Sequence, residues 1–72
     1  MAFNYRKLQG KIVEKLETQS AFAKAMGLSE RTISLKLNNK IRFTQGEIFK
    51  ACDILGIDYG DIGVYFFTPM VQ

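Results

Sequence analysis

Apolar residues recur along this chain at the three- and four-residue spacing of amphipathic helices. The first such stretch covers about residues 5–17, and Asn4 stands where its side chain can accept from the free amides of a first turn. The apolar positions of this stretch fall on one face and are Tyr5, Leu8, Ile12 and Leu16. The pattern predicts a helix that buries this face.

A second, shorter helix is predicted over about residues 19–26. Thr18 is a suitable N-cap, since its hydroxyl can accept from a first-turn amide. Gly27 ends the helix, because glycine tolerates the positive φ that a sharp turn requires. The inward stripe of this helix consists of Phe22, Ala23 and Met26.

A third helix follows directly, so the chain predicts a helix, a tight turn and a helix. Leu28 and Ile33 bracket Ser29 as a hydrophobic staple brackets an N-cap, so the helix should begin at Ser29 or Glu30 and run to about Asn38. With Ile33 at the centre of the buried face, Leu37 also points inward.

The fourth helix has the clearest boundaries. Thr44 and Glu47 form a capping box at its start, and Gly56 stops it, so it covers about residues 45–55. Its inward positions are Ile48, Ala51, Cys52 and Leu55.

A last, short helix over about residues 59–65 can be capped by Asp58. Tyr65, Phe66 and Phe67 lie at its end and are a large apolar load for so small a protein. One or two of them should close the core, and any left exposed favours a partner-binding surface. The five helices together predict an all-α, compact five-helix domain over residues 1–72, with a C-terminal tail from about residue 66.

Composition narrows the range of functions. The 72 residues include one cysteine, Cys52, and no histidine, which excludes a disulfide, a Cys/His zinc site and most pairs of nucleophile and base. We therefore expect a protein that is not an enzyme and needs no metal or cofactor. No apolar run approaches the roughly 20 residues of a membrane span, and the N-terminus lacks the apolar region of a signal peptide. A cytoplasmic location is expected.

The charge is unevenly distributed. Residues 1–43 hold nine Lys or Arg against three Glu, a balance of +6, whereas residues 44–72 hold one Lys against four Asp or Glu, a balance of −3. The basic part suits a polyanion, and the acidic part should point away from one. A merely solvated surface of mixed charge explains the totals equally well.

The outward face of the third helix carries the candidate recognition residues. Opposite Ile33 lie Arg31, Ser34, Leu35 and Asn38. Arginine can bridge guanine, asparagine can bridge adenine and serine can bond several bases, while an outward leucine fits a thymine methyl or a protein contact. A polar outer face is also what any amphipathic helix has, so this feature alone does not establish DNA binding.

Cations near this helix are candidates for phosphate contacts. Lys40 and Arg42 follow it in a loop, where they could fix the register on a duplex without selecting a sequence. Lys36, within the helix, is predicted to contact phosphate as well. A solvated basic loop is the alternative interpretation.

The second and third helices resemble the helix-turn-helix of phage Cro and lambda-type repressors. The resemblance covers about residues 5–62 and is carried by Gln19, Ala23, Gly27, Leu28, Ser29, Thr32 and Ile33. It implies base contacts from Ser29, Glu30, Arg31, Ser34, Leu35 and Asn38, and a phosphate contact from Gln19. One position departs from the pattern, since that family usually has an apolar residue where Lys36 stands.

Two functions follow from this resemblance. The first is a small phage-type transcription regulator that binds double-stranded operator DNA, with a homodimer on paired half-sites, as part of a lysis/lysogeny genetic switch. The second is an antirepressor that mainly binds a partner phage repressor, since the chain is also similar to small modulator-of-repression proteins of phages from Gram-positive bacteria. The interface expected for a protein partner is Leu35, Tyr65, Phe66 and Phe67.

Overall fold

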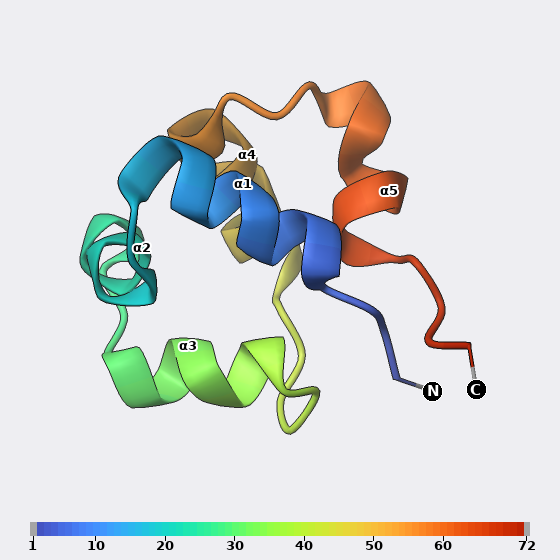
Figure 1. The fold of residues 1–72 in the computed structure, drawn as a ribbon, viewed down its shortest axis with the longest axis horizontal. Coiled ribbons are helices and arrows are strands. Elements are labelled where there is room, and N and C mark those ends of the chain that lie inside the picture. Colours follow the sequence, from blue (N-terminus) through green and yellow to red (C-terminus); the bar gives the residue numbers. More distant parts are fainter. Residues whose placement is uncertain (1, 72) are drawn as a thin grey trace.

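The computed structural model describes residues 2–71, and it confirms the predicted all-α fold with five α-helices. A 3₁₀ turn, Tyr59–Asp61, precedes the last helix (Figure 1). Within residues 2–71 no helix is long and apolar enough to cross a membrane. The helices are α1 (Arg6–Leu16), α2 (Gln19–Met26), α3 (Glu30–Leu37), α4 (Gln45–Leu55) and α5 (Ile62–Phe66).

Local capping interactions set most helix ends where the sequence places them. Thr18 Oγ1 accepts from the Ala21 amide at 3.0 Å at the start of α2. Thr44 and Glu47 form the complete capping box at the start of α4. Gly27 ends α2 with φ 74°, in the left-handed region that favours glycine. These contacts act within a few residues, which is why sequence alone predicts them.

Both ends of the helical region differ slightly from expectation. Asn4 Oδ1 accepts from the Arg6 amide at 2.9 Å, so it does satisfy a first-turn donor, although Tyr5 occupies the N-cap position. The predicted last helix divides into the 3₁₀ turn and α5, which includes Phe66. The C-terminal tail therefore starts after Phe66, one residue later than expected.

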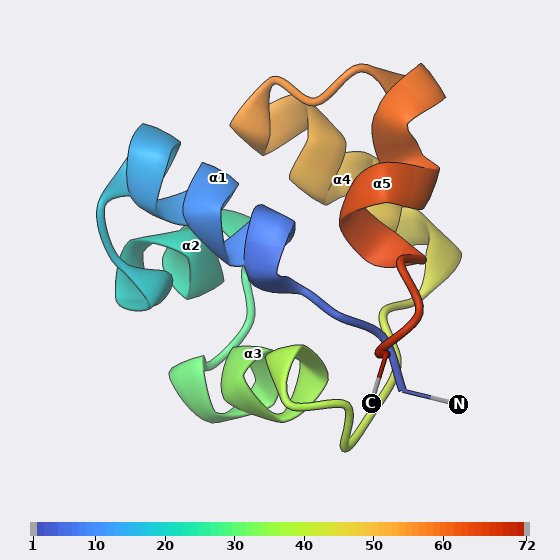
Figure 2. The ribbon, with the colours of Figure 1, turned by 45° about the vertical axis from the view of Figure 1, so that its right-hand side comes forward.

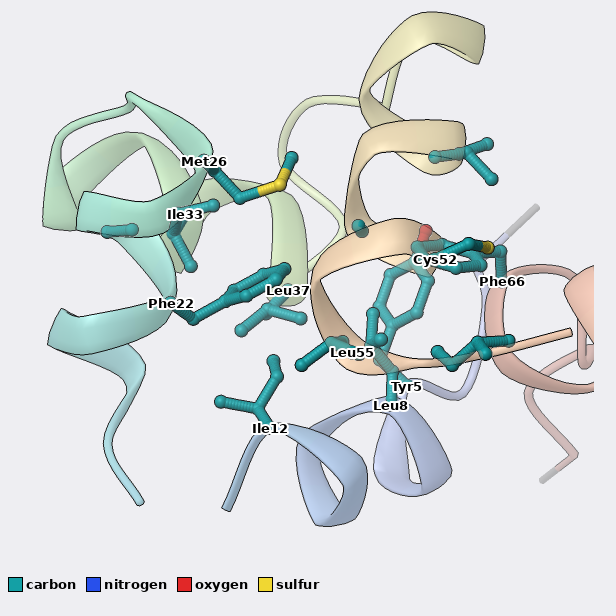
Figure 3. Packing of buried hydrophobic residues seen from close by; sticks show 14 residues of the cluster. Tyr5, Leu8, Ile12, Phe22, Met26, Ile33, Leu37, Cys52, Leu55 and Phe66 are labelled. Atoms are coloured by element: carbon teal, nitrogen blue, oxygen red, sulfur yellow. The ribbon is translucent and has the colours of Figure 1, made fainter. Parts of the chain in front are cut away.

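The five α-helices contribute side chains to one core. Leu8, Phe22, Ile33, Leu55 and Phe66 come from α1 to α5 in turn, and each is at most 1% exposed. Figure 3 shows these side chains meeting between the helices. α1 packs against α2, α4 and α5, while α3 packs on α2 at the edge of the molecule (Figure 1). This arrangement leaves the outer side of α3 uncovered by the rest of the described chain.

The N-terminal segment joins the loop after α3 to the C-terminal tail. Phe3 forms an antiparallel bridge with Pro69, and the Asn4 amide donates to the Thr68 carbonyl at 2.7 Å. On its other side, Phe3 exchanges two hydrogen bonds of 2.9 Å with the side-chain amide of Asn39. Figure 2 shows the two ends of the chain side by side near this loop. The position of the loop is thus fixed by residues far away in sequence.

Candidate functional site

α3 presents its outer side at one end of the molecule, below the other helices in Figures 1 and 2. Arg31 and Asn38 are exposed, Ser34 and Leu35 are half-buried, and Ile33 on the opposite side is fully buried. The structure therefore brings the four predicted outward residues together on one surface. Their chemistry depends on what each side chain already contacts.

The first turn of α3 is stabilised by its own polar side chains. Ser29 Oγ accepts from the Thr32 amide at 3.1 Å and donates to Thr32 Oγ1 at 2.9 Å. The hydroxyl of Ser29 is therefore used as an N-cap and has no proton left to donate to a base. Glu30 is exposed beside it, where a carboxylate is favourable for the helix but unfavourable beside a phosphate.

Asn38 is turned back onto its own helix. Its Nδ2 donates to the Ser34 carbonyl at 2.8 Å and lies 3.3 Å from Ser34 Oγ. Two of the side chains predicted to contact bases thus engage each other. Reading an adenine edge with Asn38 would first require breaking these contacts.

Two aliphatic residues, the half-buried Leu35 and the exposed Ile41, lie near these polar groups. The amides of Lys40 and Ile41 donate to the Leu35 carbonyl at 2.8 and 3.4 Å, which folds the loop back against the last turn of α3. Ile41 is 43% exposed there, next to the half-buried Leu35. Ile41 is not among the residues predicted from the sequence, although an isoleucine between two cations in a loop was the available signal. We call Arg31, Ser34, Leu35, Asn38, Lys40 and Ile41 the α3 surface.

The prediction that Lys36 contacts phosphate is wrong. Lys36 is 5% exposed, and its Nζ lies 2.8 Å from Glu47 Oε1 and donates to the Arg42 carbonyl at 2.8 Å. A side chain with both partners inside the protein has no free charge to offer a duplex. Lys36 instead occupies the inward position where an apolar residue was expected. The predicted inward face of α3 is therefore kept, and Glu47 on α4 neutralises the ammonium group.

The pKa of Glu47 is lowered from its ordinary value by this arrangement. Burial raises it, but the hydrogen bonds from Lys36 and Thr44 and the positive charge of Lys36 outweigh that effect. Glu47 therefore caps α4 and holds α3 with the same carboxylate, since its Oε1 also accepts from the Thr44 amide at 2.9 Å.

The remaining predicted phosphate contacts are accessible. Lys40 and Arg42 are exposed in the loop after α3, and the guanidinium carbon of Arg42 lies 5.9 Å from the centre of the Phe3 ring. Gln19 is exposed at the start of α2 and lines a groove with Leu37 of α3. These three side chains surround α3 but do not converge on a single point.

The C-terminal aromatic residues divide between core and surface. Phe66 is 1% exposed and packs edge-on to Phe43 at 5.4 Å between ring centres, so its assignment to a partner interface is wrong. Tyr65 is half-buried, whereas Phe67 is 48% exposed and stacks edge-on to Phe3 at 5.6 Å. Phe67 is the member of the group that a partner can contact most fully.

Fold and surface together define a small five-helix protein with one exposed helix that carries aliphatic and cationic side chains. The model of the family described as "Protein of unknown function (DUF739)" matches residues 1–69, and the chain belongs to this family. No curated protein matches the chain.

Among solved structures, the chain is similar to the modulator of repression (MOR) of the temperate bacteriophage TP901-1 from Lactococcus lactis, a solution structure. The two share 51% sequence identity with a TM-score of 0.84, over 100% of this chain and 97% of that one. The resemblance to Cro and lambda-type repressors stays a prediction from the residues of α2 and α3.

Proposed function

We propose that this protein is a phage regulator that modulates repression by binding a repressor protein through the α3 surface. Its similarity to the TP901-1 modulator of repression extends over the whole chain, at 51% identity. This similarity favours the antirepressor hypothesis over an operator-binding protein that acts alone. The proposed function is non-enzymatic.

The proposal rests on one observation, which is how the side chains on α3 are exposed and hydrogen-bonded. Leu35 and Ile41 offer apolar area, whereas Asn38 has its amide hydrogen-bonded within the helix. Protein interfaces gain most from apolar contacts at their centre with polar groups around the rim. Arg31 and Lys40 supply such a rim and would steer the surface toward an acidic region of the repressor.

Operator DNA is a second candidate ligand for the same surface. Arg31, Lys40 and Arg42 are exposed near α3, and α3 follows α2 after a short turn at Gly27, which is the order of elements in a helix-turn-helix. Glu30 opposes this role, because a carboxylate beside phosphates weakens binding. A homodimer on paired half-sites belongs to this second hypothesis.

The experiment is a calorimetric titration with the repressor encoded beside the gene, together with a gel shift on the DNA around the gene. Leu35→Ala and Ile41→Ser should each weaken repressor binding by about tenfold, since an interface contact of this kind contributes about 1 to 2 kcal/mol. Val64→Ser is the matched control, because Val64 on α5 is 42% exposed, close to the 43% of Ile41, and lies outside the α3 surface.

The proposal fails if the two α3 variants bind the repressor as the parent protein does. DNA would then be the main ligand if the protein alone shifts operator DNA selectively, with a steep salt dependence, and if Arg31→Ala weakens that binding by about 1 to 3 kcal/mol.

A further inference from the structure

A second exposed surface lies away from α3 and contains a pair of aromatic rings. Phe49 on α4 and Tyr59 in the 3₁₀ turn are 39% and 52% exposed, with 4.9 Å between ring centres and 64° between ring planes. In Figures 1 and 2 the chain between α4 and α5, which includes Tyr59, lies at the end of the molecule opposite α3. Paired aromatic residues that stay exposed in a small protein indicate a binding surface.

One aspartate contacts this ring pair, and two more belong to the turn that carries Tyr59. The Tyr59 hydroxyl donates to Asp53 Oδ1 at 2.9 Å, and Asp58 and Asp61 belong to the same turn as Tyr59. All three aspartates are exposed, and within residues 2–71 none of them forms a salt bridge. The surface therefore carries three carboxylates that have no cation beside them in this part of the chain.

The basic residue of α4 is engaged elsewhere. Lys50 Nζ donates to the Met26 carbonyl at 3.1 Å, at the C-terminal end of α2. The positive charge of Lys50 thus lies at the negative end of the α2 dipole, where it is stabilising. Lys50 therefore does not neutralise the carboxylate of Asp53, which lies one turn further along α4.

We propose that Phe49, Asp53, Asp58, Tyr59 and Asp61, here called the acidic aromatic surface, bind a protein segment that contains arginine or lysine. A guanidinium or ammonium group is attracted to the face of an aromatic ring, and carboxylates at the rim supply charge-assisted hydrogen bonds. The combination of an exposed ring pair with carboxylates that form no salt bridge within residues 2–71 fits a cation on a partner protein. It does not depend on what the α3 surface binds.

Other occupants fit this surface less well. Nucleic acid would be repelled by the three carboxylates. A second copy of the chain would have to offer its basic residues 1–43, so two unlike surfaces would meet. Such a heterologous contact grows into open chains unless the rotation closes a ring. We therefore expect the protein alone not to associate through this surface.

An NMR titration with a defined probe tests the proposal. The probe is a blocked octapeptide of alternating Arg and Ala, and the control peptide carries Gln in place of Arg. Amide resonances of Phe49, Asp53 and Tyr59 should shift with the arginine peptide and not with the control. Each of Tyr59→Ser and Asp53→Asn should weaken binding by about fivefold, as expected for one lost cation–π or ion-pair contact.

Two further variants separate this proposal from the previous one. Glu17→Gln removes an equal charge from an exposed position of the chain outside the acidic aromatic surface, and it should leave peptide binding unchanged. Leu35→Ala should leave it unchanged as well, although it weakens repressor binding. The far-UV circular dichroism of each variant verifies that it is folded.

Three results would overturn the proposal. In the first, both peptides bind equally. In the second, the arginine peptide shifts resonances elsewhere on the molecule. In the third, sedimentation shows self-association that Tyr59→Ser and Asp53→Asn both abolish, because a second copy would then be the occupant.

Discussion

Removing one partner of the Lys36 and Glu47 ion pair should have unequal effects on stability, depending on which partner is lost. The side chain of Lys36 is 6% exposed and that of Glu47 is 22% exposed. Glu47→Gln would leave a buried ammonium beside the Arg42 carbonyl, the Phe43 ring and a neutral amide, without a negative charge to compensate it. Lys36→Met would leave a carboxylate that still caps Thr44 and reaches water.

The exposed fractions of Lys36 and Glu47 determine how much each substitution should lower the free energy of unfolding. Breaking a fully buried ion pair costs about 3 to 5 kcal/mol, because the remaining charge loses its compensation. As Glu47 is partly hydrated, we expect Glu47→Gln to lower the free energy of unfolding by about 2 to 3 kcal/mol. Lys36→Met should lower it by about 1 kcal/mol or less, because the methionine fills an otherwise apolar site. The double variant, Lys36→Met with Glu47→Gln, should have a free energy of unfolding close to that of Lys36→Met alone.

The same ion pair predicts a dependence on pH. The pKa of Glu47 is depressed in the folded protein, so its contribution to stability is complete above the ordinary value of 4.5 and is lost as the pH falls through the folded value. The difference in unfolding free energy between the parent protein and Glu47→Gln should therefore narrow below pH 4.5.

Urea denaturation followed by circular dichroism measures these differences. Glu14→Gln is the matched control, since Glu14 makes ion pairs of 3.5 and 3.6 Å with Lys11 and Lys15 while its side chain is 58% exposed. Such a surface carboxylate contributes about 0 to 1 kcal/mol. Equal losses of stability in the two Glu→Gln variants would refute this role of the ion pair, as would finding Lys36→Met the most destabilised of the single variants.

Substitutions at three further positions test how the α3 surface is held in place, each by the same denaturation measurement. Asn39→Gly should lower stability by about 1 to 2 kcal/mol by removing both hydrogen bonds to Phe3, and Asn39→Ala should lower it more, because Asn39 has φ 64°. Gly27→Ala should cost about 1 kcal/mol from backbone strain alone, since a Cβ there would meet Lys50 Nζ at an ordinary 3.7 Å. Lys50→Met should cost about 0.5 to 1 kcal/mol through loss of the bond to the end of α2, and a neutral result would contradict that role.

Local signals made the helices predictable from the sequence. The N-caps Thr18 and Thr44 and the stop at Gly27 act within one helical turn, so α2 and α4 begin and end at the predicted residues. Apolar spacing likewise identified buried positions such as Phe22 and Leu55. Each of these features depends on neighbours a few residues away.

The errors concern contacts between distant elements. Lys36 looked like a surface cation, because its partner Glu47 lies on another helix and only the fold brings the two together. Phe66 and Phe67 are adjacent in sequence, and the rotation of α5 decides which of them enters the core. Backbone hydrogen bonds hold Ile41 near Leu35, in a loop that has no periodic pattern of apolar residues. These outcomes depend on tertiary packing, which spacing does not encode.

The ion pair and the Lys50 contact also change how the charge of the chain should be understood. Lys36 is buried and neutralised by Glu47, so it does not contribute to the charge available to a partner, and the ammonium of Lys50 is held at the end of α2. Arg31, Lys40 and Arg42 are exposed cations near α3, while Asp53, Asp58 and Asp61 lie toward the opposite end. Surfaces of opposite charge at opposite ends do not compete sterically, so a repressor on α3 leaves the acidic aromatic surface open to a second, basic partner.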